Sequence, residues 1–147
     1  MWKVYLSGEI HTDWRDRIRN GIVDKKLPVE LSSAVTNHEA SDDCGDVLLG
    51  KEEQAFWKDN KAAKINAIRT RKLIEDADIV VVRFGDKYRQ WNAAFDAGYA
   101  SALGKSIITL HEDSLVHPLK EVNAAALASA QTPEQVIEIL DYTINEK

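Results

Sequence analysis

Asn92 and Asp96 are the two polar residues whose types and spacing most directly suggest chemistry. They stand four residues apart in a stretch with a helical pattern, so both would lie on one ridge near the start of a helix. The stretch follows residues 79–82, a valine-rich run typical of a buried parallel strand. Small ligands bind α/β sheets at the carboxyl ends of such strands, and a helix N-terminus favours an anion. We predict a small-molecule site with Asp96 as its first candidate; the alternative is that Asp96 faces solvent.

A second candidate group, Ser7, Gly8, Glu9 and His11, follows the first expected strand. In the flavodoxin-like strand order the first and third strands are neighbours, so this group and Asp96 would face the same crevice. Gly8 would let a ligand approach the backbone closely, and Glu9 would be a second carboxylate within reach. The alternative for Glu9 and His11 is an ordinary polar loop.

Aromatic and basic side chains near this crevice suggest binding roles. Phe84, Tyr88 and Trp91 cluster between the third strand and its helix, where an aromatic ring can stack on a flat base. Trp91 could equally belong to the core. Arg69 could turn inward as an anion clamp, although the basic run around it is most simply a solvated helix face.

Composition and charge exclude several classes of function. The 147 residues carry a net charge of −5, which lacks the basic footprint of a nucleic-acid-binding protein. The single cysteine, Cys44, excludes an intrachain disulfide and fits a reducing compartment. No apolar run approaches the roughly 18 residues of a membrane span, and the N-terminal one is too short for a signal peptide. We expect a cytoplasmic protein with neither a membrane nor a nucleic-acid partner.

Metal and cofactor signatures are also missing from the sequence. His38, Asp42, Asp43 and Cys44 gather in one segment, but their spacing matches no established zinc pattern. The chain has no phosphate-binding glycine motif of the Walker or dinucleotide type, and it has no nucleophile elbow. We therefore predict no metal and no cofactor.

The elements that must position these residues alternate between strand and helix. Expected strands occupy residues 4–7, 27–35, 79–82, 106–110 and 124–130. Expected helices are one that carries Trp14, Ile18 and Ile22, then 56–76, 90–103 and a last one starting at Gln131 or Thr132. Residues 36–50 are polar and turn-rich, which predicts a long loop with a binding role or mobility. The alternation predicts one α/β domain over residues 1–147, a flavodoxin-like or Rossmann-like three-layer αβα sandwich with a five-stranded parallel sheet.

Apolar spacing predicts which side chains these helices bury. In the helix over residues 90–103, Trp91, Phe95 and Ala102 are expected to face the core, and close packing of helix on sheet would be sufficient reason for Gly98. In the last helix, the expected inward residues are Val136, Ile137 and Leu140.

Several motifs resemble the nucleoside 2-deoxyribosyltransferases. Residues 5–8 (YLSG) look like that family's opening strand and loop, and residues 78–82 (DIVVV), 96–100 (DAGYA) and 102–105 (ALGK) look like its second block. The whole chain is similar to the YtoQ branch of the family. That match rests on residues 8–11 (GEIH), 37–39 (NHE), 69–70 (RT), 84–92 (FGDKYRQWN) and 117–121 (HPLKE).

The resemblance implies a doubly wound fold, usually an oligomer, and a glutamate nucleophile that attacks the sugar C1′ to form a glycosyl-enzyme. Another base or water then replaces the departing base. Asp96 occupies the position of that glutamate, and Tyr5 matches a family tyrosine that helps position the nucleophile.

Three positions depart from the family pattern. Asp96 is one methylene shorter than glutamate, which draws the carboxylate back by roughly 1.5 Å. Thr70 stands where the family usually has an aspartate that contacts the sugar or base, and Glu9 replaces the proline after the first strand. We hypothesise that Glu9 and Asp96 form a working pair, in which one acts as nucleophile or base and the other donates a proton to the leaving base.

The combined interpretation is an enzyme that cleaves or exchanges the N-glycosidic bond of a nucleoside or nucleotide. Asp96, Glu9 and Tyr5 are the predicted catalytic residues. The predicted substrate-binding residues are Ser7, Gly8, His11, Arg69, Phe84, Tyr88, Trp91 and Asn92. Two alternatives are a non-catalytic nucleotide-binding protein of the same fold and a structural oligomer with a vestigial pocket. The expected partners are the small-molecule substrate and further copies of the chain.

Overall fold

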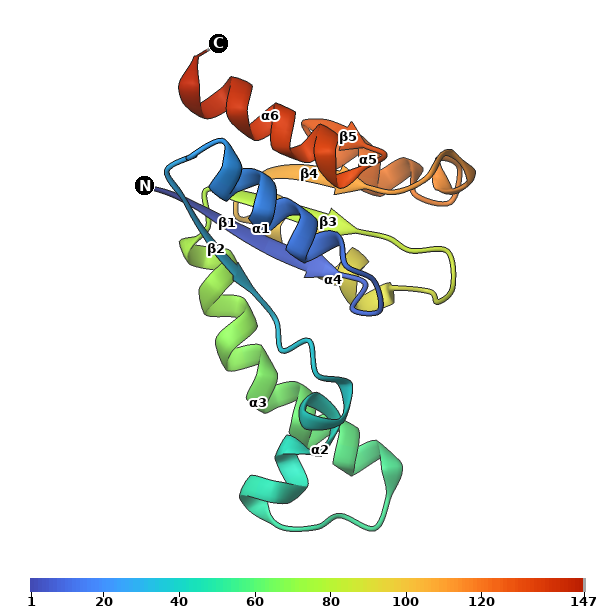
Figure 1. Ribbon diagram of the computed structural model, residues 1–147. Coiled ribbons are helices and arrows are strands. Elements are labelled where there is room, and N and C mark those ends of the chain that lie inside the picture. Colours follow the sequence, from blue (N-terminus) through green and yellow to red (C-terminus); the bar gives the residue numbers. More distant parts are fainter. Residues whose placement is uncertain (147) are drawn as a thin grey trace.

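A five-stranded parallel sheet organises the computed structural model, which describes residues 1–146. The strands are β1 (Trp2–Gly8), β2 (Val29–Ser33), β3 (Ile79–Arg83), β4 (Ser106–Leu110) and β5 (Ala128–Ala130), in the spatial order β2-β1-β3-β4-β5. The helices are α1 (Trp14–Asp24), α2 (His38–Leu49), α3 (Ala55–Asp76), α4 (Trp91–Ala102), α5 (Lys120–Ala125) and α6 (Pro133–Asn145), with a 3₁₀ turn at Asp113–Leu115. This order and these layers confirm the predicted α/β sandwich (Figure 1).

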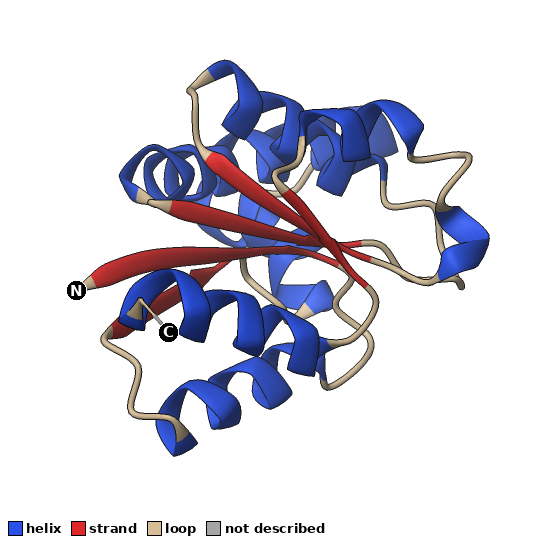
Figure 2. Cartoon of the chain, turned by 90° about the horizontal axis from the view of Figure 1, so that it is seen from above, coloured by secondary structure: helices blue, strands red, loops and turns tan. Residues whose placement is uncertain are grey.

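Helices cover both faces of the sheet (Figure 2). On one face, side chains of α1 and α6 pack against β1 residues such as Val4 and Leu6. On the other face, α3 and α4 pack around Tyr5 and the neighbouring strand residues. The alternation of side chains along β1 produces this division, because successive residues of a strand point to opposite faces.

The two central strands bring the predicted site segments together. β1 pairs with both β2 and β3, and Gly8 at the end of β1 lies opposite Arg83 at the end of β3. Val80, Val81 and Val82 are wholly buried, as expected for a parallel strand covered on both faces. The predicted adjacency of the first and third strands is therefore confirmed.

The segment expected to be a loop, residues 36–50, is mostly helix α2, so that prediction is wrong. Asn37 caps the helix by accepting a hydrogen bond from the backbone N–H of Ala40 at 2.9 Å, and Gly50 ends it at φ 94°. The polar, turn-prone composition of α2 predicts a loop, but the segment forms a helix because it packs on α3. At Gly45 the two helices are so close that a Cβ atom would lie 2.9 Å from that of Lys61.

Helix α4 buries a different face from the one predicted. Trp91 and Phe95 are 72% and 67% exposed, and Ala102 is exposed as well. The buried face consists of Ala93, Ala97 and Ala100, spaced by four and three. These small side chains let the helix lie close to the sheet, so the large apolar residues were wrongly assigned to the core. Gly98 also faces open space, since an added Cβ would meet no atom within 4 Å.

The start and the buried residues of the last helix, α6, agree with the prediction from the sequence. Thr132 and Gln135 form a capping box at its start, and Val136, Ile137 and Leu140 are buried as predicted. Its packing also accounts for Gly21 in α1, because a Cβ there would lie 2.2 Å from Cδ1 of Ile137.

Candidate active site

A hydrogen bond between Ser7 and Asp96 joins the end of β1 to the second turn of α4. The Ser7 side chain is buried, and its hydroxyl donates to Oδ2 of Asp96 at 2.7 Å. Burial raises the pKa of Asp96, and the hydrogen bond from Ser7 opposes part of that rise. The result is a fixed carboxylate that is more basic than one on the surface, with no cation in ion-pair contact among residues 1–146.

Tyr5 lies two residues before Ser7 on the same face of β1 and is wholly buried. Burial, with the negative charge of Asp96 as a second cause, raises the pKa of the Tyr5 hydroxyl to about 12. That hydroxyl makes no hydrogen bond of good geometry within residues 1–146, although the nearby Thr70 side chain acts to lower its pKa. Tyr5 is therefore a neutral phenol beside Asp96 with a proton still to donate.

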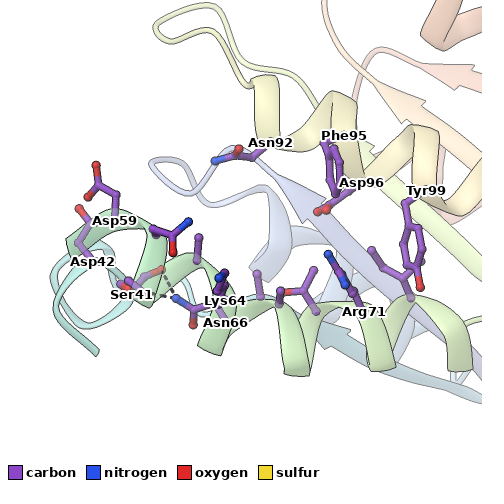
Figure 3. A pocket seen from close by; sticks show the side chains of 17 residues that line it. Ser41, Asp42, Asp59, Lys64, Asn66, Arg71, Asn92, Phe95, Asp96 and Tyr99 are labelled. Atoms are coloured by element: carbon purple, nitrogen blue, oxygen red, sulfur yellow. Dashed lines mark hydrogen bonds between the residues drawn. The ribbon is translucent and has the colours of Figure 1, made fainter. Parts of the chain in front are cut away.

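Asp96 opens into a cavity of about 710 Å³ between α3 and α4 (Figure 3). This volume is in the range of small-molecule sites. Helix α4 contributes Asn92, Phe95, Asp96 and Tyr99, and the far end reaches Ser41 and Asp42 on α2. The α3 wall combines the small side chains Ala62, Ala63, Ala67 and Thr70 with the polar or charged ones of Asp59, Asn60, Lys64, Asn66 and Arg71. Small residues on α3 thus leave the room into which Asp96 points.

Glu9 belongs to a separate hydrogen-bond network in the loop after β1. Its Oε1 accepts from the backbone N–H groups of His11 and Thr12, and its Oε2 accepts from the Thr12 hydroxyl at 2.6 Å. Burial alone would raise the pKa of Glu9, but these hydrogen bonds hold it below its usual value. Glu9 is an ionised carboxylate that holds its own loop, and it does not line the Asp96 cavity.

The same loop depends on a glycine and a buried arginine. Gly8 has φ 113°, and a Cβ there would lie 2.1 Å from the carbonyl oxygen of Arg83. The guanidinium of Arg15 donates to the carbonyl oxygens of Glu9 at 2.6 Å and Gly8 at 3.2 Å, while it lies over the Trp14 ring. Sequence reasoning missed Arg15, because a charged residue beside Trp14 gives no sign that it turns inward.

The predicted aromatic residues lie apart from the cavity. Phe84 is buried in the core between the sheet and α4. The Tyr88 ring lies 4.8 Å from the ring of His11 and is largely exposed, so these two loops meet at the carboxyl end of the sheet. Trp91 is exposed on the outer side of α4.

Among the predicted residues, the structure brings Tyr5, Ser7, Asn92 and Asp96 together at the cavity or directly behind it. Arg69 does not line the cavity, and its guanidinium donates instead to the carbonyl oxygen of Ser33 at 3.4 Å. Lys64 and Arg71 on the same helix do line it. Sequence reasoning missed both, because they belong to a basic run that resembles a solvated face.

Residues 1–146 contain no helix with both the length and the apolar character that a bilayer span requires. They also contain no cluster of three or more histidine, cysteine, aspartate or glutamate side chains arranged to hold a metal ion.

The strand order defines an α/β protein of the doubly wound class. The chain belongs to the YtoQ family of nucleoside 2-deoxyribosyltransferases, whose family model matches residues 5–144. It is 44% identical over 139 residues to the uncharacterized protein YtoQ of Bacillus subtilis (strain 168), covering 95% of this chain and 94% of that protein.

Two solved structures share this fold at low sequence identity. One is a 2-deoxyribosyltransferase from Bacillus psychrosaccharolyticus, with a TM-score of 0.55, 17% identity and coverage of 92% of this chain and 90% of that one. The other is the Clostridium botulinum CMP N-glycosidase BcmB, with a TM-score of 0.53, 14% identity and coverage of 95% and 98%. The fold therefore occurs both in a protein named as a 2-deoxyribosyltransferase and in one named as an N-glycosidase.

Proposed function

We propose that this protein cleaves or exchanges the N-glycosidic bond of a nucleoside or nucleotide, with Asp96 as the nucleophile. The observation that carries the proposal is the partly buried Asp96 carboxylate, which is hydrogen-bonded by Ser7 and opens into a cavity of about 710 Å³. The family membership supports the same chemistry.

In the proposed reaction an Asp96 carboxylate oxygen attacks C1′ of the sugar. The C1′–N bond breaks, and its electron pair leaves with the base, which takes up a proton from solvent. The Ser7 hydroxyl keeps the carboxylate aimed into the cavity, and Asn92, on the same helical ridge, orients the substrate. A second base or water then attacks C1′ and releases Asp96, which gives exchange or hydrolysis.

Tyr5 and Glu9 support this step in different ways. The Tyr5 hydroxyl is protonated, with the Thr70 side chain beside it and no hydrogen bond of good geometry within residues 1–146, so it can donate a hydrogen bond to the carboxylate or to the sugar. Glu9 has a lowered pKa and three donors on its oxygens, which makes it a poor source of a proton. We assign Glu9 to the positioning of the loop after β1.

The shorter side chain of Asp96 requires the sugar to come closer to α4. Two features support that fit. The buried alanines of α4 let the helix lie close to the sheet, and the small side chains at Ala63, Ala67 and Thr70 leave space on the opposite wall. A sugar that lies against this wall could reach the Asp96 carboxylate, although the aspartate side chain is roughly 1.5 Å shorter than that of glutamate.

The test is incubation with ribonucleosides, 2′-deoxynucleosides and their 5′-monophosphates, followed by chromatography for free or exchanged base. We expect release or exchange with at least one substrate, and Asp96→Ala should abolish it. A panel without turnover would reject the enzymatic proposal. Thermal stabilisation by a nucleotide without turnover would instead favour the non-catalytic binding protein.

We also propose that the chain self-associates through the outer face of α4, in the cytoplasm. Trp91 and Phe95 are exposed one turn apart, and Gly98 beside them has no packing reason within residues 1–146. Phe95 also lines the Asp96 cavity, so this face borders the candidate site. A second copy of this face would bury both aromatic rings around the glycine. Light scattering should give a dimer or larger species, and Phe95→Ser should shift it toward monomer; a monomeric wild-type protein at micromolar concentration would reject this.

A further inference from the structure

Two basic side chains of α3 differ from the other four on that helix. Lys58, Lys61 and Lys72 form ion pairs with Asp43, Glu52 and Asp76, and Arg69 donates to a backbone carbonyl. Lys64 and Arg71 make no ion pair or side-chain hydrogen bond within residues 1–146, and these two line the Asp96 cavity. The cations that the fold itself does not use are thus those that a ligand would meet.

Lys64 and Arg71 lie at different points along the α3 wall of the cavity, with Lys64 nearer to α2. They are seven residues apart, so about 10.5 Å of helix separates them. Figure 3 shows Arg71 at the end where Asp96 and Tyr99 lie, while Lys64 lies toward Asn66 and Ser41. At that second end, Nδ2 of Asn66 donates to the Ser41 carbonyl oxygen at 3.0 Å. One end therefore offers a guanidinium across the cavity from the nucleophile, and the other offers amide and hydroxyl groups together with the carboxylates of Asp42 and Asp59.

We propose that the substrate is a nucleoside 5′-monophosphate, with its phosphate on Arg71 and its base toward Asn66. This inference rests on the proposed function, because Asp96 must mark the position of C1′. The paired N–H groups of a guanidinium match two phosphate oxygens. A phosphate carries nearly two negative charges at pH 7, so a cation beside it offsets its repulsion by Asp96. Side-chain amides at the far end can bond the polar edge of a base.

The first experiment compares kcat/KM for base release from matched nucleoside and 5′-monophosphate pairs. We expect the monophosphate to be preferred by about 10- to 100-fold, the range of a hydrogen-bonded charge pair. Arg71→Gln should bring that preference close to one. Lys64→Gln should change both substrates by a similar factor and preserve the preference. Lys72→Gln removes the same charge outside the cavity and should leave both rates unchanged.

Three results would overturn the assignment of the phosphate to Arg71. They are equal use of nucleoside and monophosphate by the wild type, an equal loss for both substrates in Arg71→Gln, and a collapse of the preference in Lys64→Gln instead. The last result would place the phosphate on Lys64 instead.

A second measurement separates this inference from the proposed function. Isothermal titration gives the affinity of the wild type and Arg71→Gln for the same matched pairs without any turnover. If no base is released, the proposed function fails. Tighter binding of the monophosphate that is lost in Arg71→Gln would still support the phosphate site, and equal or absent binding would reject it.

Discussion

The Ser7 hydroxyl lies 2.7 Å from Oδ2 of Asp96, so the last buried residue of β1 holds the carboxylate of α4. This contact unites two segments that are 89 residues apart in the chain. It also opposes the rise that burial causes in the Asp96 pKa. The Ser7 hydroxyl thus orients the proposed nucleophile and moderates the basicity that burial gives it.

Substitutions at Asp96 and Ser7 test this dependence on the reaction that the wild type is found to catalyse. Asp96→Asn keeps the shape but removes the nucleophile, and kcat should fall by about 10³-fold or more. Ser7→Ala should lower kcat by about 10-fold. It should also move the acid limb of the pH–rate profile to higher pH, because a hydrogen bond that lowers the pKa of Asp96 is lost. Full activity with an unshifted profile in Ser7→Ala would contradict the role given to that hydroxyl.

The two carboxylates should have opposite effects on stability as pH changes. The Asp96 pKa is raised in the folded state, so the folded protein is favoured at low pH, and that advantage is lost as pH rises through the folded pKa. Asp96→Asn should therefore raise Tm at pH 7 by about 2–4 °C. The Glu9 pKa is lowered, so its contribution is present above the unfolded pKa and is lost as pH falls through the folded one. Glu9→Gln should lower Tm at pH 7, with the difference shrinking below pH 4.5, the usual pKa of glutamate.

Thermal unfolding of both variants between pH 3 and pH 8 measures these trends. Gln and Asn keep the size of the side chains, so packing changes little. A Tm change of the same sign in both variants at pH 7 would contradict the opposite environments of the two carboxylates.

Filling the cavity should abolish binding without unfolding the protein. Ala67→Phe places a ring on the α3 wall opposite Asp96, so the thermal shift given by a bound nucleotide should disappear while the Tm of the free protein changes by only a few degrees. Ala124→Phe, at an exposed position of α5 outside the cavity, is the matched control and should keep the shift. Retained ligand stabilisation in Ala67→Phe would show that the nucleotide binds elsewhere.

Two glycines should respond differently to alanine. Gly8→Ala forces a Cβ into the Arg83 carbonyl at φ 113°, so the free energy of unfolding should fall by about 2–4 kcal/mol. Gly98→Ala meets no atom and lies inside α4, so it should stabilise the isolated chain by about 0.5–1 kcal/mol. Urea unfolding measures both values, and Gly98→Ala should also weaken the proposed self-association. Comparable losses of stability in the two variants would contradict the open surroundings of Gly98.

Much of the fold could be predicted from local patterns. The valine run of β3 and the Trp14, Ile18 and Ile22 stripe of α1 identify their elements, because burial on the sheet demands those residue types. Helix α2 could not be predicted in this way, since its stability depends on the close contact of Gly45 with α3. The same limit applies to α4, where small alanines form the buried face and size alone is misleading.

The candidate site could be predicted only in part, because some of its residues are positioned by contacts between helices. Asp96 and Ser7 follow from strand order, because the carboxyl ends of neighbouring parallel strands share one edge. The contributions of Lys64 and Arg71 depend on how α3 lies relative to α4, and no local pattern encodes that packing. A run of basic residues has the same sequence pattern whether its side chains face solvent or a cavity.

A tilt of helix α3 would change the width of the cavity unevenly along its length. The C-terminal end of α3 is anchored at Ile74 in the core between the sheet and the helices. Its N-terminal half packs on α2, and this half and α2 together project away from the sheet (Figure 1). A rotation of about 10° around Ile74 would move Lys64, ten residues or about 15 Å away, by roughly 2.6 Å. Arg71, less than one turn from Ile74, would move by only about 0.8 Å. The nucleophile end would thus keep its dimensions while the far end adapts to bases of different size.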